Sequence, residues 1–324
     1  MSIRVSVIIP AYNSQDTIER TVNSVLEQNY SNFELIVVND GSHDNTQEKL
    51  KRYGEKIKLI SIENRGVAAA RSIGLSSATG EYVMFLDSDD RLNTNALSSL
   101  VNECESNDYD IVIGQSKIIH ANGHTSRTKF SRNEDVSCLE NYLDNNFPVT
   151  FWPAIYKKSI LLNVKLNNGF ITGEDFVVNS EIYSNEPSVS VIDNLVHTYS
   201  RSPGSITANM NPIKYQDNFK AFKKGVDIII TVRGSEERIE SAIYKKYLNY
   251  CFSILLARSP YFYEALESMR NYKNENSLPI NSWSYGLRLN ILSFIFNKDK
   301  CILKLFVDFF SFLRNKRILR RDEN

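Results

Sequence analysis

The sequence predicts an α/β fold with a mostly parallel central sheet flanked by helices, followed by a helical C-terminal extension. Short apolar, β-branched runs alternate with helical patterns over the first hundred residues. Alternation of this kind implies parallel strands with helices on both faces of the sheet. Residues 214–270 instead read mainly as helices. At 324 residues the chain is long enough for one large domain or two ordinary ones.

The strand candidates are short apolar runs, several of which end in polar residues. We expect strands at residues 5–10, 34–39, 57–62, 82–87 and 111–113. The helix candidates lie between them, and the first follows Ser14, a residue type that caps helices well. The other helices are expected at residues 44–53, at 65–77, and from Leu97 to Cys104. From about 115 to 210 the pattern weakens into turns, short helices and a hairpin region.

Composition excludes several classes of protein. Acidic and basic residues balance at 38 each, so no global charge indicates a nucleic-acid binder. The four cysteines form no C-x-x-C pair, which argues against a zinc site or a small disulfide framework and fits a reducing compartment. We find no signal peptide and no uninterrupted apolar stretch of membrane-spanning length. We therefore expect a cytoplasmic protein.

Polar or aromatic residues follow three of the predicted strands. Ligands of parallel sheets bind beyond the carboxyl ends of the strands, so Pro10, Asp40 and Asp87 should meet at one edge. Tyr12 offers a flat face to a nucleobase, with backbone groups near Pro10 available to the base edge. Asp40 can accept a bond from an imide N–H, which uracil has. The alternative is plain turn chemistry at residues 13–14 and 40–42.

The fourth strand is followed by the acidic segment Asp87-Ser88-Asp89-Asp90. Carboxylates are expensive to bury without a partner and suit a divalent cation. Asp87 and Asp89 are two positions apart, so an extended backbone would point both to one side. We favour Asp89 as the direct metal ligand. Asp87 would contact the ribose or the water molecules around the metal, and Asp90 is the alternative candidate. Alternatively, one acid caps a helix that begins near Asn93.

Two other charged segments are candidates for the chemistry. Arg71 lies on the helix that leads back to the acidic segment, where it can meet a phosphate. Its alternative is an exposed helical arginine. Glu174 and Asp175 precede a helical run, and one of them can act as a general base toward an acceptor hydroxyl. The alternative is that both acids simply stabilise the first turn of a helix.

Residues 197–207 combine a strand-like entry with a Ser-Pro-Gly turn. Arg201 or His197 can close over a diphosphate there. An edge hairpin is the alternative.

Taken together, these segments resemble the family 2 glycosyltransferases of bacterial surface-polysaccharide synthesis, which have a GT-A fold. The matching residues are 5–13, 38–42, 64–66 with 70–71, and 80–90, followed more loosely by Trp152, 156–159, 174–175, and Tyr199 with Arg201 and 205–207. Three positions depart from the family pattern: Asn39 replaces an aspartate, Ser72 replaces an asparagine, and Pro153-Ala154 replaces a polar pair on the acceptor side.

The resemblance implies an inverting, metal-dependent enzyme with a Rossmann-like nucleotide-binding half. It implies a UDP-sugar donor, Mn²⁺ or Mg²⁺, and a glycan or polyprenyl-diphosphate-linked acceptor for capsule, O-antigen or similar polymers. It assigns Asp175, with Glu174, to catalysis and Asp89 with Asp87 to the metal. The nucleotide-sugar contacts are then expected at Pro10, Tyr12, Asp40, Arg71, Asp87, Ser88 and Arg201.

The same resemblance suggests a division of the chain. Residues 1–210 would form the glycosyltransferase domain, with 1–110 as the nucleotide-sugar half and 111–210 as the acceptor half. Residues 211–324 would be the helical C-terminal region. Within it, the apolar face and trailing arginines of 285–324 suggest a segment that binds the inner face of the cell membrane peripherally. Packing on the core or a dimer contact is the alternative for that segment.

Two other functions fit some of these features. A sugar nucleotidyltransferase would need a Gly-rich N-terminal loop with Arg and Lys, which this sequence lacks. A catalytically silent subunit that binds a nucleotide sugar, or that serves as a scaffold for a polysaccharide synthesis complex, would keep the binding residues and need no general base.

Overall fold

The computed structural model describes residues 2–120, 122–166, 168–200, 212–234, 236–256 and 262–275. The chain separates into two compact units. The first contains Met1–Met210 and Lys220–Gly234, and the second contains Asn211–Phe219 and Ser235–Asn324. The expected membrane-facing segment 285–324 lies outside the described residues.

The first unit is built on one sheet with the strand order β3-β2-β1-β4-β8-β6-β9-β5, and β7 pairs with β6. The strands are β1 (Val5–Ala11), β2 (Phe33–Asp40), β3 (Lys58–Ile62), β4 (Tyr82–Phe85), β5 (Arg91–Leu92), β6 (Ile111–Ile119), β7 (Thr125–Arg127), β8 (Ala154–Lys157) and β9 (Val189–Ser200). The first four pair in parallel, as predicted. The other half is mixed, because β8 runs antiparallel to both β4 and β6, while β9 runs parallel to β6 and antiparallel to β5.

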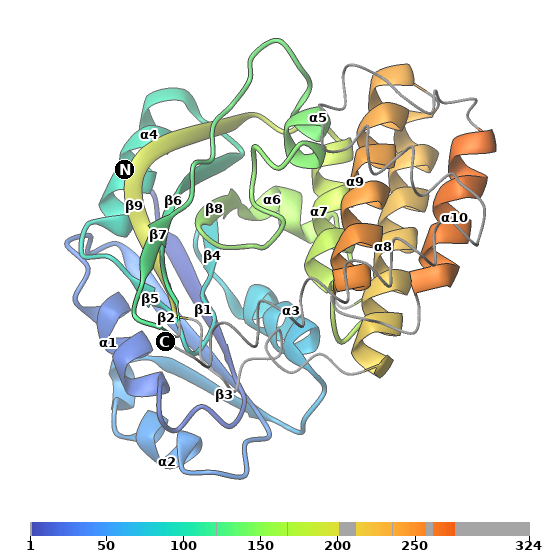
Figure 1. The fold of residues 1–324 in the computed structure, drawn as a ribbon. Helices are drawn as coiled ribbons and strands as arrows, with labels where there is room; N and C mark the ends of the chain where they lie inside the picture. Colours follow the sequence, from blue (N-terminus) through green and yellow to red (C-terminus); the bar gives the residue numbers. More distant parts are fainter. Residues whose placement is uncertain are drawn as a thin grey trace. The chain divides into compact units, whose positions relative to one another are not determined.

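Helices cover both faces of this sheet. They are α1 (Ile18–Leu26), α2 (Thr46–Lys51), α3 (Val67–Ser77), α4 (Ala96–Asn107), α5 (Cys138–Leu143), α6 (Lys158–Leu162) and α7 (Glu174–Ser184). Apolar residues of α1 and α4 form one buried core with Val7 and Ile9 of β1. On the other face α3 packs very closely, since a Cβ added at Gly74 would lie 2.4 Å from Cγ2 of Ile8. Figure 1 shows α1 and α3 on opposite sides of β1.

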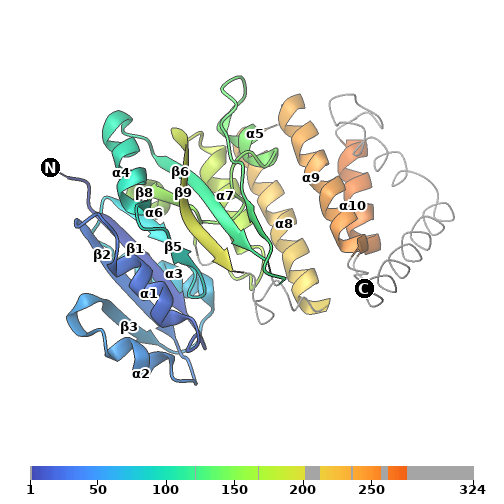
Figure 2. The same cartoon turned by 60° about the vertical axis from the view of Figure 1, so that its left-hand side comes forward.

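The helical region predicted for residues 214–270 is confirmed. It consists of α8 (Pro212–Arg233), α9 (Glu237–Leu256) and α10 (Phe262–Glu275). Within the second unit α9 and α10 lie side by side (Figure 2). The ring centroids of Tyr247 and Tyr272 are 5.5 Å apart. The apolar face expected on α9 is buried at Tyr244, Leu248 and Cys251. No helix in the described ranges is long and apolar enough to cross a membrane.

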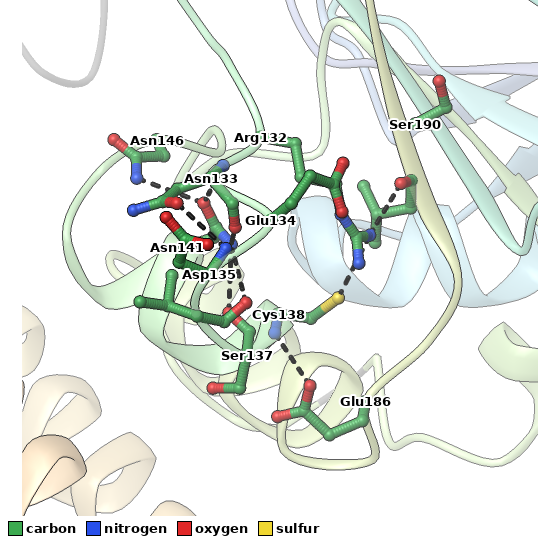
Figure 3. Close-up of polar contacts among 12 residues, drawn as sticks. Arg132, Asn133, Glu134, Asp135, Ser137, Cys138, Asn141, Asn146, Glu186 and Ser190 are labelled. Atoms are coloured by element: carbon green, nitrogen blue, oxygen red, sulfur yellow. Dashed lines mark hydrogen bonds and ion pairs between the residues drawn. The ribbon is translucent and has the colours of Figure 1, made fainter.

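A polar network orders the region of weak sequence pattern after β7. Ser137 and Glu140 form a capping box at the start of α5. Asn141 is fully buried, and its side chain donates to the carbonyls of Asn133 (2.9 Å) and Ser137 (3.0 Å) (Figure 3). Glu186 accepts a bond from the backbone N–H of Cys138 over 2.7 Å. These bonds satisfy polar groups that are buried here. In an exposed loop the same groups would form hydrogen bonds with water.

Candidate functional site

The acidic segment forms a turn directly after β4. The strand ends at Phe85 rather than at Asp87, and the backbone N–H of Asp90 donates to the carbonyl of Asp87 over 3.1 Å. The expected extended backbone from Asp87 to Asp89 is therefore wrong, because this i to i+3 bond closes a β-turn. We call residues 87–90 the acidic turn. The hydroxyl of Thr21 on α1 lies between two carbonyls of this turn, 2.9 Å from that of Ser88 and 2.8 Å from that of Asp90, and its single proton is shared between them.

Asp89 has the properties of a cation ligand. Burial raises the pKa of its carboxyl to about 6, and the neighbouring Asp90 and Asp87 add to the shift. Arg20 donates to the backbone carbonyl of Asp89 (2.9 Å), and no side chain in the described part of the chain donates to the Asp89 carboxylate. A divalent cation would relieve this like-charge repulsion, so the residues present fit Mg²⁺ or Mn²⁺.

The described residues contain no group of three or more His, Cys, Asp or Glu residues arranged to hold a metal. A site of one or two carboxylates, in which water and substrate phosphates would complete the shell of Mg²⁺, has fewer protein ligands than such a group. The Asp87 side chain, which is 33% exposed, is the second oxygen donor on the turn.

Arg71 joins the acidic turn to the first turn of α7. One terminal nitrogen, Nη2, donates to Asp87 over 2.9 Å, and the other, Nη1, donates to Glu174 (3.0 Å) and Asp175 (2.9 Å). The side chain is only 5% exposed and lies over the ring of Phe151, 5.2 Å from its centroid. Burial by itself lowers the pKa of a guanidinium, but the three carboxylates outweigh burial and raise it.

Arg71 is not the exposed helical arginine of the alternative interpretation, because its side chain is buried. Each terminal nitrogen donates to at least one carboxylate, and the contact of Arg71 with a phosphate stays a prediction. The small residues of α3 explain the position of Arg71. They let the helix approach the sheet closely, which brings the buried Arg71 side chain to the carboxyl end of β4.

Glu174 and Asp175 begin α7, as the alternative interpretation of acids in a first helical turn requires. Gly173 precedes them with φ of +80°, a conformation that favours glycine. The Asp175 side chain is 17% exposed, and burial raises the pKa of its carboxyl well above the usual range. Arg71 opposes that rise, whereas Glu174 and Asp87 add to it. Asp175 is therefore a buried carboxylate with a raised pKa that shares the Arg71 guanidinium with Asp87 of the acidic turn.

The nucleobase candidates lie at the ends of β1 and β2. Tyr12 is 45% exposed, and its ring meets His43 edge-on with centroids 6.4 Å apart. Two bonds tie the strand ends together: the backbone N–H of Asn13 donates to Ser42 Oγ (3.0 Å), and that of His43 donates to Asn13 Oδ1 (2.9 Å). An exposed aromatic ring is thus held at the exit of β1, next to Pro10.

Asp40 is buried and organises the loop before α3. Its two oxygens accept the backbone N–H groups of Arg65 and Gly66, each over 2.8 Å. Gly41 must be glycine here, because its φ is +69° and an added Cβ would lie 2.7 Å from the nitrogen of Asn64. A carboxylate oxygen has two lone pairs, so each retains one acceptor position. The contact of Asp40 with a uracil imide stays a prediction.

Ser88 is tied to the end of β1. Its hydroxyl lies 2.7 Å from the hydroxyl of Ser14, whose backbone N–H donates to Thr46 Oγ1 over 2.7 Å. The acidic turn, β1 and α2 are thereby linked through hydroxyl groups. The predicted role of Ser88 toward the nucleotide stays a prediction.

The third acid of the turn, Asp90, was not assigned a partner from the sequence. It is fully buried and accepts a bond from Nε2 of His197 over 3.0 Å. Asp90 does not cap the following helix, since α4 begins after Asn95 and has no side-chain cap. His197 is also fully buried, so closure of His197 over a diphosphate does not agree with this structure. Arg201 lies outside the described residues.

The sequence was compared with known families and proteins. The sequence profile of the family described as "Glycosyl transferase family 2" matches residues 6–185. The chain is 29% identical to "Glycosyltransferase GlyA" of Streptococcus pneumoniae over 221 residues, which are 63% of this chain and 31% of that protein. This chain therefore spans about a third of that relative.

A second relative is covered more fully. The chain is 33% identical over 204 residues to "UDP-Glc:alpha-D-GlcNAc-diphosphoundecaprenol beta-1,3-glucosyltransferase WfgD" of Escherichia coli, covering 56% of this chain and 80% of that protein. Among solved structures, S. aureus TarS 1-349 in complex with UDP-GlcNAc superposes with a TM-score of 0.68 at 22% identity, covering 90% of this chain and 84% of the other. That likeness supports the predicted GT-A fold.

Proposed function

The chain belongs to glycosyl transferase family 2, and from this membership we propose that it is an inverting glycosyltransferase. It would move a sugar from a UDP-sugar to a hydroxyl group of a glycan or a lipid-linked acceptor. The observation that carries this proposal is the Arg71 bridge, which holds Asp87 of the acidic turn and Asp175 of α7 on one guanidinium. With Asp87 beside the leaving group and Asp175 as the base, the two proposed sites would be adjacent, as a single displacement requires.

The donor side of the site would use the carboxyl ends of three strands. Tyr12 would stack on the uracil, and Asp40 would accept its imide N–H through the free lone pair of an oxygen. Asp89, with Asp87, would hold Mn²⁺ or Mg²⁺ against the diphosphate. A bound cation of this kind neutralises the negative charge that grows on a diphosphate leaving group.

The acceptor side would use Asp175 as the general base. Its carboxylate would take the proton of the acceptor hydroxyl while that oxygen attacks the anomeric carbon from the face opposite the leaving UDP. One such displacement inverts the anomeric centre. The raised pKa of Asp175 suits this role, because a base works best when its pKa lies near the working pH.

Arg71 would be a positioning residue in this reaction. Its rigid fork fixes the carboxylate of Asp175 relative to Asp87 and limits the rise of the Asp175 pKa. Glu174 shares Nη1 of the same guanidinium and would orient Arg71 rather than take the proton, since Glu174 is the more buried of the two acids.

The acceptor class is inferred from the relatives. WfgD is described as acting on a diphosphoundecaprenol-linked sugar, so a polyprenyl-diphosphate-linked acceptor in surface-polymer synthesis is our proposal for this chain too. Such an acceptor lies in the membrane, and peripheral contact with the inner face of the cell membrane belongs to the same proposal.

A screen of UDP-sugars for hydrolysis tests the activity. The chain is incubated with Mn²⁺ and UDP-glucose, UDP-galactose or a UDP-N-acetylhexosamine, and free UDP is measured. We expect slow release of UDP from one donor, with acceleration when a sugar-diphosphoprenol is added, and loss of release in EDTA. UDP binding without release from any donor, with or without acceptor, would instead indicate a silent binding subunit.

A further inference from the structure

The carboxylate of Asp90 differs from those of Asp87 and Asp89 in the hydrogen bonds that it accepts. Asp90 is fully buried, and its two oxygens accept bonds from His197 Nε2 (3.0 Å) and from the backbone N–H of Ser200 (3.3 Å). Both partners lie on β9, about a hundred residues along the chain. Burying a carboxylate costs free energy, and these two hydrogen bonds offset part of that cost. A role of Asp90 in the function of the site would explain why a buried carboxylate is present here.

His197 is held on three sides. Its Nδ1 lies 3.1 Å from the hydroxyl of Ser116 on β6, its Nε2 faces Asp90, and its ring stacks on Trp152 with centroids 4.7 Å apart. Since a carboxylate only accepts, Nε2 carries the proton toward Asp90, and Nδ1 is then free to accept from Ser116. The imidazole is thereby locked in one orientation by residues from one strand (Ser116 of β6), the acidic turn (Asp90) and the segment before β8 (Trp152).

The backbone of Asp90 also belongs to the acidic turn. Its N–H closes the turn by donating to Asp87, and its carbonyl accepts the hydroxyl of Thr21. Asp90 is next to Asp89, the proposed cation ligand. Any displacement of Asp90 would therefore move the carboxylates of both Asp87 and Asp89.

We propose that Asp90 and His197 form a positioning pair that anchors the acidic turn to β9 and so sets the geometry of Asp87 and Asp89 toward the metal and the diphosphate. This inference rests on the proposed function, because the pair would act on the donor site proposed there. Asp90 would not be a metal ligand, since both oxygens are bonded and fully buried. Asp87 and Asp89 would then face the donor, and Asp90 would hold the turn that carries them.

The test uses Asp90→Asn and His197→Gln, singly and together, in the full chain. UDP binding is measured by calorimetry with Mn²⁺ and with EDTA, and binding of Mn²⁺ by itself is measured by electron paramagnetic resonance. Groups that orient metal ligands typically contribute about 10–100-fold to metal affinity. We expect each single variant to weaken Mn²⁺-dependent UDP binding by at least about tenfold, and the double variant to be no weaker than the worse single variant.

Ser190→Ala is the matched control. It removes a bond of 2.8 Å from β9 to Glu103 but touches neither Asp90 nor His197, so we expect unchanged UDP affinity with Mn²⁺. All variants are checked by thermal melting, and Asp90→Asn, which keeps the shape of the side chain, covers the case in which His197→Gln fails to fold. Binding in EDTA should stay at the parent value in every variant.

Two results are decisive against the pair. If Asp90→Asn and His197→Gln melt at lower temperature yet bind UDP with Mn²⁺ as the parent does, the pair is merely structural and the inference is overturned while the proposed function stands. If the parent chain itself binds no UDP with Mn²⁺, the proposed function and this inference are both overturned.

Discussion

Arg71 Nη2 donates to Asp87 Oδ1 over 2.9 Å from a guanidinium that is almost fully buried. The same guanidinium holds the acids of α7, so the position of the candidate base is linked to the position of the acidic turn by one rigid side chain. A planar guanidinium has a fixed fork of donors, which lysine lacks.

Asp175→Asn should keep UDP binding and abolish transfer. The asparagine amide has nearly the shape of the carboxylate but cannot take up the proton of the sugar-acceptor hydroxyl. A lost general base lowers the rate by about 10²–10⁴-fold. Turnover is measured as free UDP at saturating donor and acceptor, and UDP affinity by calorimetry. Glu181→Gln, an acid on the same helix, is the control and should turn over like the parent; parent-like turnover in Asp175→Asn would reject Asp175 as the base.

Turnover should fall on acidification at a higher pH than for an ordinary aspartate. Burial raises the pKa of Asp175, and the base works only when deprotonated, so turnover declines as pH falls through that raised value. Turnover at saturating donor is measured from pH 4.5 to 9, and UDP affinity over the same range separates the titration of Asp89. An acid limb centred at or below the usual value of about 4 would contradict this assignment.

Asp89→Asn should stabilise the metal-free chain at pH 7.5 and remove the metal-dependent part of UDP affinity. The folded-state pKa of Asp89 is about 6, above its usual 3.8. The charged form is therefore disfavoured by folding, and the penalty grows as pH rises from about 4 and is complete above about 6. We expect a gain of about 1–2 kcal/mol in unfolding free energy at pH 7.5, measured with urea in EDTA, and almost none at pH 4.

A cost in stability at pH 7.5 would show that Asp89 is a structural carboxylate instead. Asp16→Asn, a change of the same type at an exposed residue, is the control for general effects of the substitution.

Arg71→Met should destabilise the chain strongly at pH 8. The variant leaves three carboxylates without their shared partner, and breaking a buried ion pair in this way costs about 3–5 kcal/mol. At pH 5.5 the loss should be smaller, because the unpaired acids can take up protons. Unfolding free energy is measured at both pH values, with Arg52→Met, an exposed arginine, as the control. An equal loss at both pH values would argue that packing on Phe151 matters more than charge.

The sequence by itself determined the first half of the fold and the edge at which the site lies. Strands β1 to β4 and helices α1, α3 and α4 follow from local periodicity, which depends only on nearby residues. The meeting of Pro10, Asp40 and Asp87 at one edge follows as well, because parallel strands joined by helices place their carboxyl ends together. The mixed half of the sheet lacked such a pattern. Its strands β5, β7 and β8 have only 2, 3 and 4 residues, and the longer β6 and β9 pair with each other across a large separation in the sequence.

Only the tertiary structure decided which charged groups are partners. Arg71 bonds to acids 16, 103 and 104 positions away, and Asp90 bonds to a histidine 107 positions away. The acids of the turn are chemically alike in the sequence, and burial makes them different: Asp90 is enclosed by β9, whereas Asp87 keeps part of its surface. Burial and pairing depend on how distant segments pack, and no local pattern of residues encodes that packing.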